Sequence, residues 1–183
     1  MKKCPKCLKK EETDVVRFCK HCGAELFFVS RFPKENSGSK TITVSTRLPA
    51  APDAIWEKLQ SISTLQYITA PFASFKPLAD QPFIWKAGHG FKFRLKIFGI
   101  FPIGIHTINV IQFDKETLAI YTNESNKHVP VWNHRIILVK QGDTTDYTDE
   151  VEIYAGWKTF IVVLWSKLFY RHRQRKWLKL LQK

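Results

Sequence analysis

The sequence predicts an α+β fold in which a curved antiparallel sheet wraps around one long C-terminal helix, with two short helices and a small cysteine-rich module at the N-terminus. Three observations lead to this prediction. Residues 156–183 contain no proline and no acidic residue, which suits a single long helix. Residues 91–155 consist of short segments in which apolar and polar side chains alternate, as in half-buried strands. All four cysteines lie within the first 22 residues.

Length and charge limit the classes of protein to which the chain can belong. Its 183 residues suffice for one medium domain and a small module, and its 44% hydrophobic content is ordinary for a globular protein. The net charge of +13 is placed at the ends: residues 1–40 carry 10 basic and 5 acidic side chains, residues 41–155 carry 11 and 11, and residues 156–183 carry 8 and 0. The neutral middle argues against a nucleic-acid groove across the main domain, whereas basic ends suit nucleic acid, anionic lipid or an acidic partner.

The cysteines predict a structural zinc site. Their spacing is C-x2-C-x11-C-x2-C, which brings four thiolates to one tetrahedral Zn²⁺ ion: Cys4, Cys7, Cys19 and Cys22. Four thiolates close the coordination shell and leave no position for a catalytic water. His21 lies within the second pair and is an alternative ligand, although the thiolates are the better prediction.

The same stretch resembles the short bacterial zinc-ribbon family. The matching residues around the second cysteine pair are Phe18, Gly23, Ala24 and Leu26. The resemblance covers residues 1–26 and implies a structural zinc ribbon that recognises a protein or nucleic-acid partner or tethers the domain. Met1-Lys2-Lys3 leads into a polar segment rather than an apolar signal sequence, so reduced thiols in a cytoplasmic protein are expected. Residues 27–40 lose periodicity and predict a linker, which leaves residues 41–183 as the main domain.

The main domain begins with a strand and two short helices. The strand is predicted over 41–48, and a helix then opens at Pro52 and buries Ile55, Trp56 and Leu59. A second short helix is predicted over 64–69. Five strands follow, at 91–97, 103–113, 118–123, 132–140 and 145–155.

The last two strands are predicted to form a hairpin around Gly142-Asp143. Lys140 then opposes Thr145, and the numbers of paired residues sum to about 285. Opposed residues share a face, so the covered face is predicted to hold Trp132, His134, Ile136, Leu138, Tyr147, Asp149, Val151 and Ile153. Two polar groups, His134 and Asp149, thus lie among apolar ones and need partners.

The C-terminal helix is predicted to cover this face. Its expected inward stripe consists of Trp157, Phe160, Ile161, Leu164, Trp165 and Leu168, continued by Arg171, His172 and Arg175. Asp149 precedes Gly156 by about 23 Å of strand, and Arg171 follows it by about 23 Å of helix. The sequence therefore predicts an ion pair of Asp149 with Arg171 or His172. Whether this polar cluster only anchors the helix or also serves a ligand stays open.

The uncharged apolar run of this helix is too short to span a membrane. It extends from Thr159 to Ser166, far below the ~18–20 residues required. A membrane-surface helix remains an alternative, since its second half is basic and carries Trp177, Leu178, Leu180 and Leu181. We favour the simpler interpretation, in which this half is a solvated end packed on its own domain.

Three motifs in the main domain carry a family resemblance. They are Trp132-x-His134, Thr145-x-Tyr147-Thr148-Asp149-x-Val151, and Tyr170-Arg171-His172-Arg173 followed by Trp177 and Leu180-Leu181. With its order of elements, the chain resembles the START-like (SRPBCC) helix-grip superfamily, in its polyketide cyclase/dehydrase-like or ligand-binding branch. The resemblance implies an apolar cavity between sheet and helix, but no single reaction, because members range from cyclases to carriers. Many relatives carry a further His where this chain has Ile136, which weakens the transfer of a His-based mechanism.

These expectations favour a domain that binds a small hydrophobic molecule. The candidate ligand-binding residues are Phe93, Leu95, Trp132, His134, Ile136, Tyr147, Asp149, Val151, Ile161, Leu164 and Leu168. One alternative is a cyclase or dehydratase in which His134 acts as general base, Asp149 orients it and Arg171 steadies an enolate oxygen. A cavity that is open to a ligand and holds His134 and Asp149 within hydrogen-bond reach favours that enzyme. Another alternative is a nucleic-acid or membrane-surface regulator that acts through the basic ends.

Overall fold

A computed structural model describes residues 2–3, 10–11, 38–78 and 84–182. The chain divides into two units, Met1–Lys34 and Glu35–Lys183. In the first unit, β1 (Lys2–Lys3) pairs with β2 (Lys10–Glu11) in antiparallel fashion. The four cysteines lie outside the described residues, so the zinc site stays a prediction.

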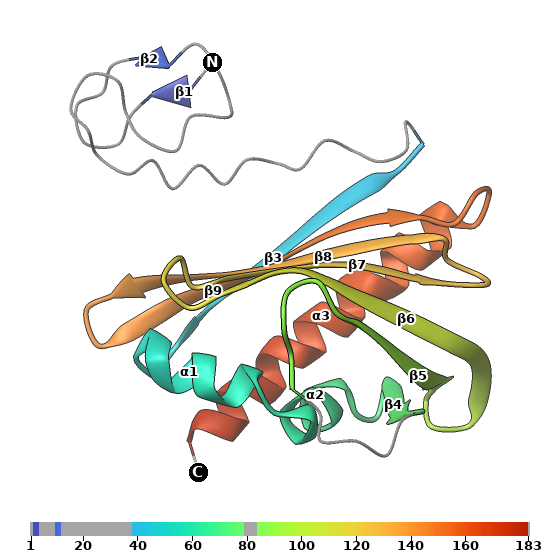
Figure 1. The fold of residues 1–183 in the computed structure, drawn as a ribbon, viewed down its shortest axis with the longest axis horizontal. Helices are drawn as coiled ribbons and strands as arrows, with labels where there is room; N and C mark the ends of the chain where they lie inside the picture. The colour runs from blue at the N-terminus through green and yellow to red at the C-terminus, as the bar shows by residue number, and fades with distance from the viewer. Residues whose placement is uncertain (1, 4–9, 12–37, 79–83, 183) are drawn as a thin grey trace. The chain divides into compact units, whose positions relative to one another are not determined.

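The second unit is built on a seven-stranded antiparallel sheet in the order β3-β9-β8-β7-β6-β5-β4. The strands are β3 (Lys40–Leu48), β4 (Ala73–Pro77), β5 (Gly90–Ile97), β6 (Phe101–Asp114), β7 (Ala119–Asn126), β8 (Val131–Gln141) and β9 (Thr144–Tyr154). Figure 1 shows this sheet curving over one long helix. The predicted strands are all present, and β4 is an addition that the sequence analysis missed.

Three helices complete the unit. They are α1 (Pro52–Leu59), α2 (Ile62–Thr69) and α3 (Thr159–Leu181). Pro52 occupies the first turn of α1, where its missing N–H costs nothing, and the Ser63 N–H donates to Oγ of Ser61 at the start of α2. Figure 1 shows α3 crossing beneath the sheet, while α1 and α2 close the lower side. No helix among the described residues has the length and apolar run needed to cross a bilayer.

The β8–β9 hairpin has the predicted register. Lys140 pairs with Thr145 and His134 with Val151, and the tight turn places Gly142 at a positive φ of 61°. All eight residues predicted for the covered face are buried. The two-residue turn and strict alternation therefore determine which side chains face α3.

The orientation of α3 differs from the prediction. Of the expected inward stripe, Trp165 is half-buried, whereas Trp157, Phe160, Ile161, Leu164 and Leu168 are exposed. The sheet instead receives Ser166, Phe169, Tyr170, Arg173, Gln174 and Trp177. Both sides of the first half of α3 are apolar, so periodicity alone does not reveal the inward side. The second half of α3 determines which side faces the sheet, because the large side chains of Tyr170 and Trp177 are buried there.

Two apolar clusters flank the middle of α3. One gathers around Phe93, Trp132 and Phe169, and the other around Trp56, Tyr147 and Trp177. The last apolar residues of α3 pack against the second cluster: Leu178, Leu180 and Leu181. The end of α3 is therefore packed on its own domain, as favoured above, and its apolar residues are not a free membrane face.

Candidate functional site: a buried cavity with a polar wall

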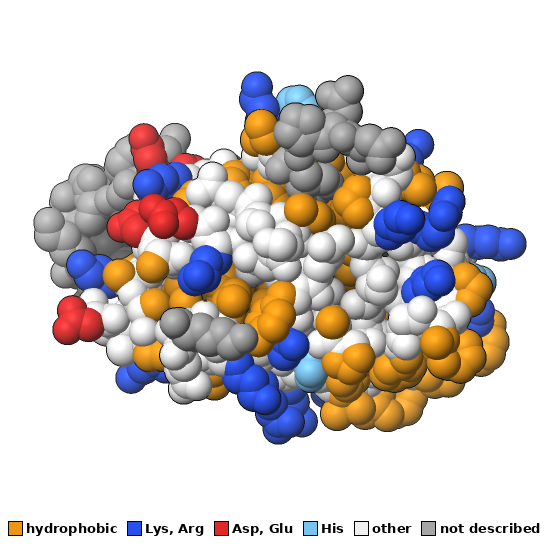
Figure 2. Space-filling view, turned by 90° about the horizontal axis from the view of Figure 1, so that it is seen from below, with side chains coloured by type: hydrophobic (Ala, Val, Ile, Leu, Met, Phe, Trp, Pro, Cys, Tyr) orange, Lys and Arg blue, Asp and Glu red, His pale blue; other side chains and the backbone are white. Residues whose placement is uncertain are grey.

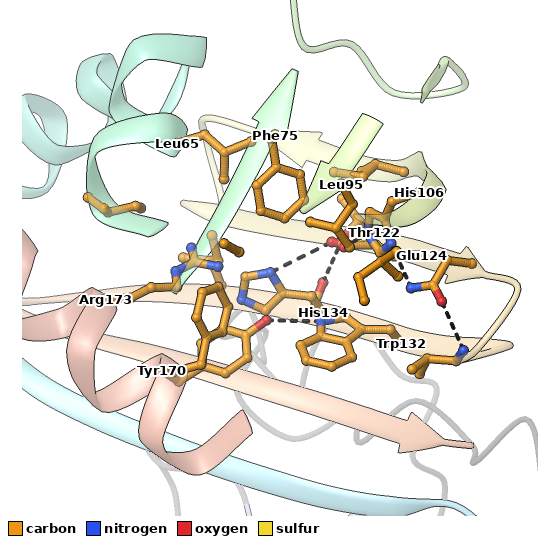
Figure 3. Close-up of a pocket in the computed structure, with 18 of the residues that line it drawn as sticks. Leu65, Phe75, Leu95, His106, Thr122, Glu124, Trp132, His134, Tyr170 and Arg173 are labelled. Carbon is orange, nitrogen blue, oxygen red and sulfur yellow. Dashed lines mark hydrogen bonds and ion pairs between the residues drawn. The ribbon is translucent and has the colours of Figure 1, made fainter. Parts of the chain in front are cut away.

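A cavity of about 390 Å³ lies between the sheet and α3. Its walls come from the end of α1, from α2, from strands β4 to β8 and from α3, and most of the lining side chains are apolar. Figure 3 shows residues of these elements converging on one space, among them Leu65 of α2, Phe75 of β4 and Leu95 of β5. The curvature of the sheet and the oblique path of α3 leave this volume unfilled.

Five of the predicted ligand-binding residues line this cavity: Leu95, Trp132, His134, Ile136 and Ile161. Phe93, Tyr147, Asp149 and Val151 are completely buried and do not line it. Leu164 and Leu168 lie on the exposed side of α3, away from the cavity, because α3 turns its other side inward. The predicted positions on the β8–β9 face thus lie at or behind the cavity wall, whereas two of the three predicted α3 positions are misplaced.

Asp149 is the centre of a buried polar network behind this wall. Its Oδ1 accepts a hydrogen bond from Nε2 of His134 at 2.8 Å and from the hydroxyl of Tyr147 at 3.2 Å. Its Oδ2 accepts one from Nε2 of Gln174 at 3.2 Å. Burial raises the pKa of Asp149, but the charge of Arg173 and the bonds from His134 and Gln174 outweigh burial and lower it below 3.8. The side chain is therefore a carboxylate at neutral pH.

The basic partner of Asp149 is Arg173 rather than Arg171 or His172. Nη2 of Arg173 lies 3.9 Å from Oδ1 of Asp149, and both side chains are buried. Arg171 is exposed, and Nε2 of His172 donates to the carbonyl oxygen of Ala70 at 2.8 Å. The predicted pairing was wrong in the helical position, because α3 begins at Thr159 rather than Gly156 and faces the sheet with another side.

Arg173 has unused hydrogen-bonding capacity. It lines the cavity, is only 5% exposed, and its Nε has no hydrogen-bond partner within the described part of the chain. The guanidinium lies over the ring of Tyr170 at 5.0 Å. Burial lowers the pKa of Arg173, but the charge of Asp149 outweighs this effect and raises it, so the group stays positive. A buried N–H group without an acceptor is expected to attract one.

A second polar cluster lies on β6 and β7 and was not predicted. Glu124 accepts hydrogen bonds from Nε2 of His106 at 2.9 Å and from the hydroxyl of Thr122 at 2.7 Å. Nδ2 of Asn126 lies 3.2 Å from Nδ1 of His106. Burial raises the pKa of Glu124, but His106, His134 and Thr122 together lower it below 4.5. A carboxylate is thus held inside a cavity whose lining is mostly apolar.

His134 lies between the two carboxylates, and Figure 3 shows its ring beside Glu124. Its Nε2 meets Asp149 at 2.8 Å, and its Nδ1 lies 3.9 Å from Oε1 of Glu124. That separation exceeds a hydrogen bond. The ring therefore has one nitrogen fixed by Asp149 and the other facing the cavity beside Glu124, which is the geometry of an oriented acid–base group.

The described residues place no arrangement suited to a metal ion in the cavity. Among residues 38–78 and 84–182, no group of three or more His, Asp, Glu or Cys side chains is placed to hold one. His106 and His134 instead face carboxylates at hydrogen-bonding distance. The described side chains that line the cavity can supply apolar contact, hydrogen bonds and proton transfer.

No protein-family model matches the chain, and no curated protein matches it. Solved structures do. A Chromobacterium violaceum protein gives a TM-score of 0.63 at 14% identity, covering 78% of this chain and 97% of its own. A START superfamily protein from Mycobacterium smegmatis gives a TM-score of 0.62 at 12% identity, and the match covers 78% of this chain and 97% of that protein.

Norcoclaurine synthase from Thalictrum flavum, in complex with dopamine and hydroxybenzaldehyde, gives a TM-score of 0.57 at 16% identity, covering 79% of this chain and 87% of its own. At identities this low, the comparisons show a shared fold and carry no information about shared chemistry. The main domain of this protein therefore has the helix-grip fold of START superfamily proteins.

Proposed function

We propose that this protein binds one small hydrophobic molecule in the cavity beneath the sheet, with an acceptor oxygen of that molecule facing Arg173. The observation that carries the proposal is a cavity of about 390 Å³ with mainly apolar walls and one buried guanidinium whose Nε lacks a partner. This volume lies within the range of pockets that enclose small molecules. The fold shared with START superfamily proteins is consistent with such binding.

The polar wall suggests the chemical class of the ligand. A carbonyl or carboxylate oxygen satisfies the free N–H of Arg173, and an apolar body fills the space between Leu65, Leu95 and Trp165. Glu124 already accepts hydrogen bonds from His106 and Thr122. Its remaining capacity suits a donor group, such as a hydroxyl, on the same molecule.

Native mass spectrometry of the full chain purified from its own host tests this proposal, because a retained ligand adds a defined mass. A titration with the apolar fluorophore N-phenyl-1-naphthylamine provides a second readout. Leu65→Trp places a larger side chain into the cavity and should weaken probe binding roughly tenfold or more. Ile111→Trp, at a half-exposed position on β6 that does not line the cavity, is the matched control. Equal binding by both variants would contradict the proposed site.

A second candidate is an acid–base enzyme that uses the same cavity. The favouring observation is that His134 lines the cavity while Asp149 holds its Nε2 at 2.8 Å. In this function His134 exchanges a proton with the ligand through Nδ1, Asp149 orients the ring, and Arg173, not Arg171, stabilises negative charge on the ligand oxygen.

The ligand itself distinguishes a carrier from an enzyme. The wild-type chain and the His134→Gln variant are purified from the same host, and their retained molecules are weighed. An enzyme should retain chemically different molecules in the two proteins, compared by chromatographic retention and fragmentation as well as by mass, because the variant stops at the substrate and a cyclisation can leave the mass unchanged. A carrier should retain the same molecule in both.

For the N-terminal segment we propose a structural Zn²⁺ ion held by Cys4, Cys7, Cys19 and Cys22. The support is their spacing and the resemblance of residues 1–26 to zinc ribbons. In this role the ribbon recognises a protein or nucleic-acid partner or tethers the cavity-bearing domain. Zinc content and partner capture by the wild-type chain, compared with a Cys19→Ser variant, test the proposal.

A further inference from the structure

One side of α3 is apolar and unpartnered by the described residues. Phe160, Ile161, Leu164 and Leu168 are each more than half exposed, and they recur at helical spacing along one side of α3. Trp157, just before α3, is 84% exposed. Scattered exposed apolar residues are ordinary, but five large ones in twelve positions form a patch that needs an explanation.

The turn between β5 and β6 extends this patch. Phe98, Ile100 and Phe101 are exposed there. Phe98 contacts Phe72 at 5.6 Å between ring centroids, and Phe72 contacts Trp165 of α3 at 6.5 Å. Figure 2 shows a broad apolar area on the side where α3 begins and this turn lies. The apolar patch, as the term is used below, consists of Phe98, Ile100, Phe101, Trp157, Phe160, Ile161, Leu164 and Leu168.

The charges that the described residues place around the apolar patch are of one sign. Residues 84–113 contain four basic and no acidic side chains, and residues 156–183 contain eight and none. Arg171 and Arg175 are exposed and continue the side of α3 that carries Leu164 and Leu168. In Figure 2, Lys and Arg side chains border the apolar area on two sides, and the acidic side chains visible in this view lie toward the other end of the molecule.

We propose that the apolar patch and its basic border dock on an anionic lipid bilayer. Apolar and aromatic side chains enter the boundary between head groups and acyl chains, while lysine and arginine meet the anionic head groups. A second copy of the chain is a poorer occupant, because a symmetric contact would bring Arg171 and Arg175 of both copies to the same interface.

Ile161 joins this surface to the cavity. It is exposed as part of the apolar patch, and it also lines the cavity. Ile97 and Ile103, next to the β5–β6 turn, line the cavity too. A docked protein therefore presents an edge of its cavity to the bilayer. This step, which rests on the proposed function, makes the bilayer the source or the destination of the hydrophobic ligand.

Flotation of the full chain with vesicles tests the docking without any cavity ligand. We expect binding to vesicles of phosphatidylcholine with phosphatidylglycerol, and much weaker binding to phosphatidylcholine alone. Phe160→Ser combined with Leu164→Ser should reduce binding about tenfold or more. Ile111→Ser combined with Val139→Ser, two exposed apolar residues on β6 and β8, is the control and should bind as the wild type.

A second pair of variants tests the charges. Arg171→Gln combined with Arg175→Gln should weaken binding to the anionic vesicles about thirtyfold, since each basic group near such a surface contributes about fivefold. Lys115→Gln combined with Lys140→Gln removes two charges, one from the β6–β7 turn and one from the end of β8, at the other end of the sheet, and should have little effect. Brominated lipids should quench wild-type tryptophan emission more than that of Trp157→Phe, because Trp157 enters the bilayer.

Three results would overturn the proposal. One is equal binding by the two apolar pairs of variants. Another is a dimer in sedimentation equilibrium that Phe160→Ser with Leu164→Ser dissociates, which would make the apolar patch a contact between copies. The third is a wild-type chain that binds neither kind of vesicle while N-phenyl-1-naphthylamine still fills the cavity, which would leave the proposed ligand binding intact and remove the docking alone.

Discussion

Nη2 of Arg173 lies 3.9 Å from Oδ1 of Asp149, and the two residues use their hydrogen-bonding capacity very differently. Asp149 accepts from His134, Tyr147 and Gln174, so both of its oxygens are occupied. Nε of Arg173 has no partner among the described residues. The aspartate therefore holds the polar network together and balances the buried charge, and in the proposed function a ligand oxygen supplies the acceptor that Arg173 lacks.

Asp149→Asn should destabilise the main domain by roughly 3–5 kcal/mol, because it removes the negative charge and leaves Arg173 buried and unpaired. Urea unfolding followed by far-UV circular dichroism measures this loss. Asp146→Asn provides the control: Asp146 pairs with Arg47 on the exposed side of the same hairpin, and its loss should matter much less. Similar losses in both variants would show that burial of Asp149 carries no special weight.

Glu124 should make the domain sensitive to acid. Because its folded pKa lies below its ordinary value, its contribution to the free energy of unfolding is present above about pH 4.5 and is lost as the pH falls through the folded pKa. Glu124→Gln should be less stable than the wild type at pH 7, and the difference should shrink below pH 4.5. Urea unfolding from pH 7 to pH 3 measures it.

Glu116→Gln is the matched control for Glu124→Gln, since Glu116 lies exposed in the β6–β7 turn. Its difference from the wild type should be small and nearly constant with pH. A stability difference for Glu124→Gln that does not change between pH 7 and pH 3 would contradict the role assigned to the Glu124 carboxylate.

Zinc removal should leave the main domain folded. A segment of about 26 residues has little core of its own and depends on its metal, whereas the main domain has two large apolar clusters. We expect one zinc per chain and, after chelation, an unchanged cooperative thermal transition of the main domain. If chelation abolished that transition, the two parts would be one folding unit.

The β8–β9 face could be predicted because its determinants are local. The two-residue turn at Gly142-Asp143 sets the register, and alternation then assigns His134 and Asp149 to the same side of the sheet. The fold class followed from the order of elements alone. These features depend on neighbours in sequence, which is why one sequence sufficed.

The rest of the site depends on geometry that the sequence does not reveal. The β6–β7 pairing shifts by one residue between Val110 and Gln112, and this irregularity decides that His106 faces Glu124. The inward side of α3 depends on where the helix starts, and an offset of a few residues exchanged Arg171 for Arg173. The signal that was overlooked is Trp177, four residues after Arg173, which marks the buried side.

The last prediction concerns the charge of Arg173 inside the cavity. Two fluorophores share one aromatic body: N-phenyl-1-naphthylamine is neutral, and anilinonaphthalene sulfonate adds an anionic group. A buried guanidinium whose Nε lacks an acceptor should favour the sulfonate, so the wild-type chain should bind the anionic probe more tightly, and Arg173→Met should reduce that preference roughly tenfold or more. Arg171→Met, two positions earlier on the exposed side of α3, should retain it.

Circular dichroism must first show that Arg173→Met is folded, since the substitution leaves Asp149 without its cation. If Asp149 then destabilises the variant, Arg173→Met combined with Asp149→Asn restores charge balance, and the preference should still be lost. A preference for the anionic probe that survives in this double variant would place the probe's sulfonate elsewhere, and Arg173 would then be a partner of Asp149 and not a ligand-binding group.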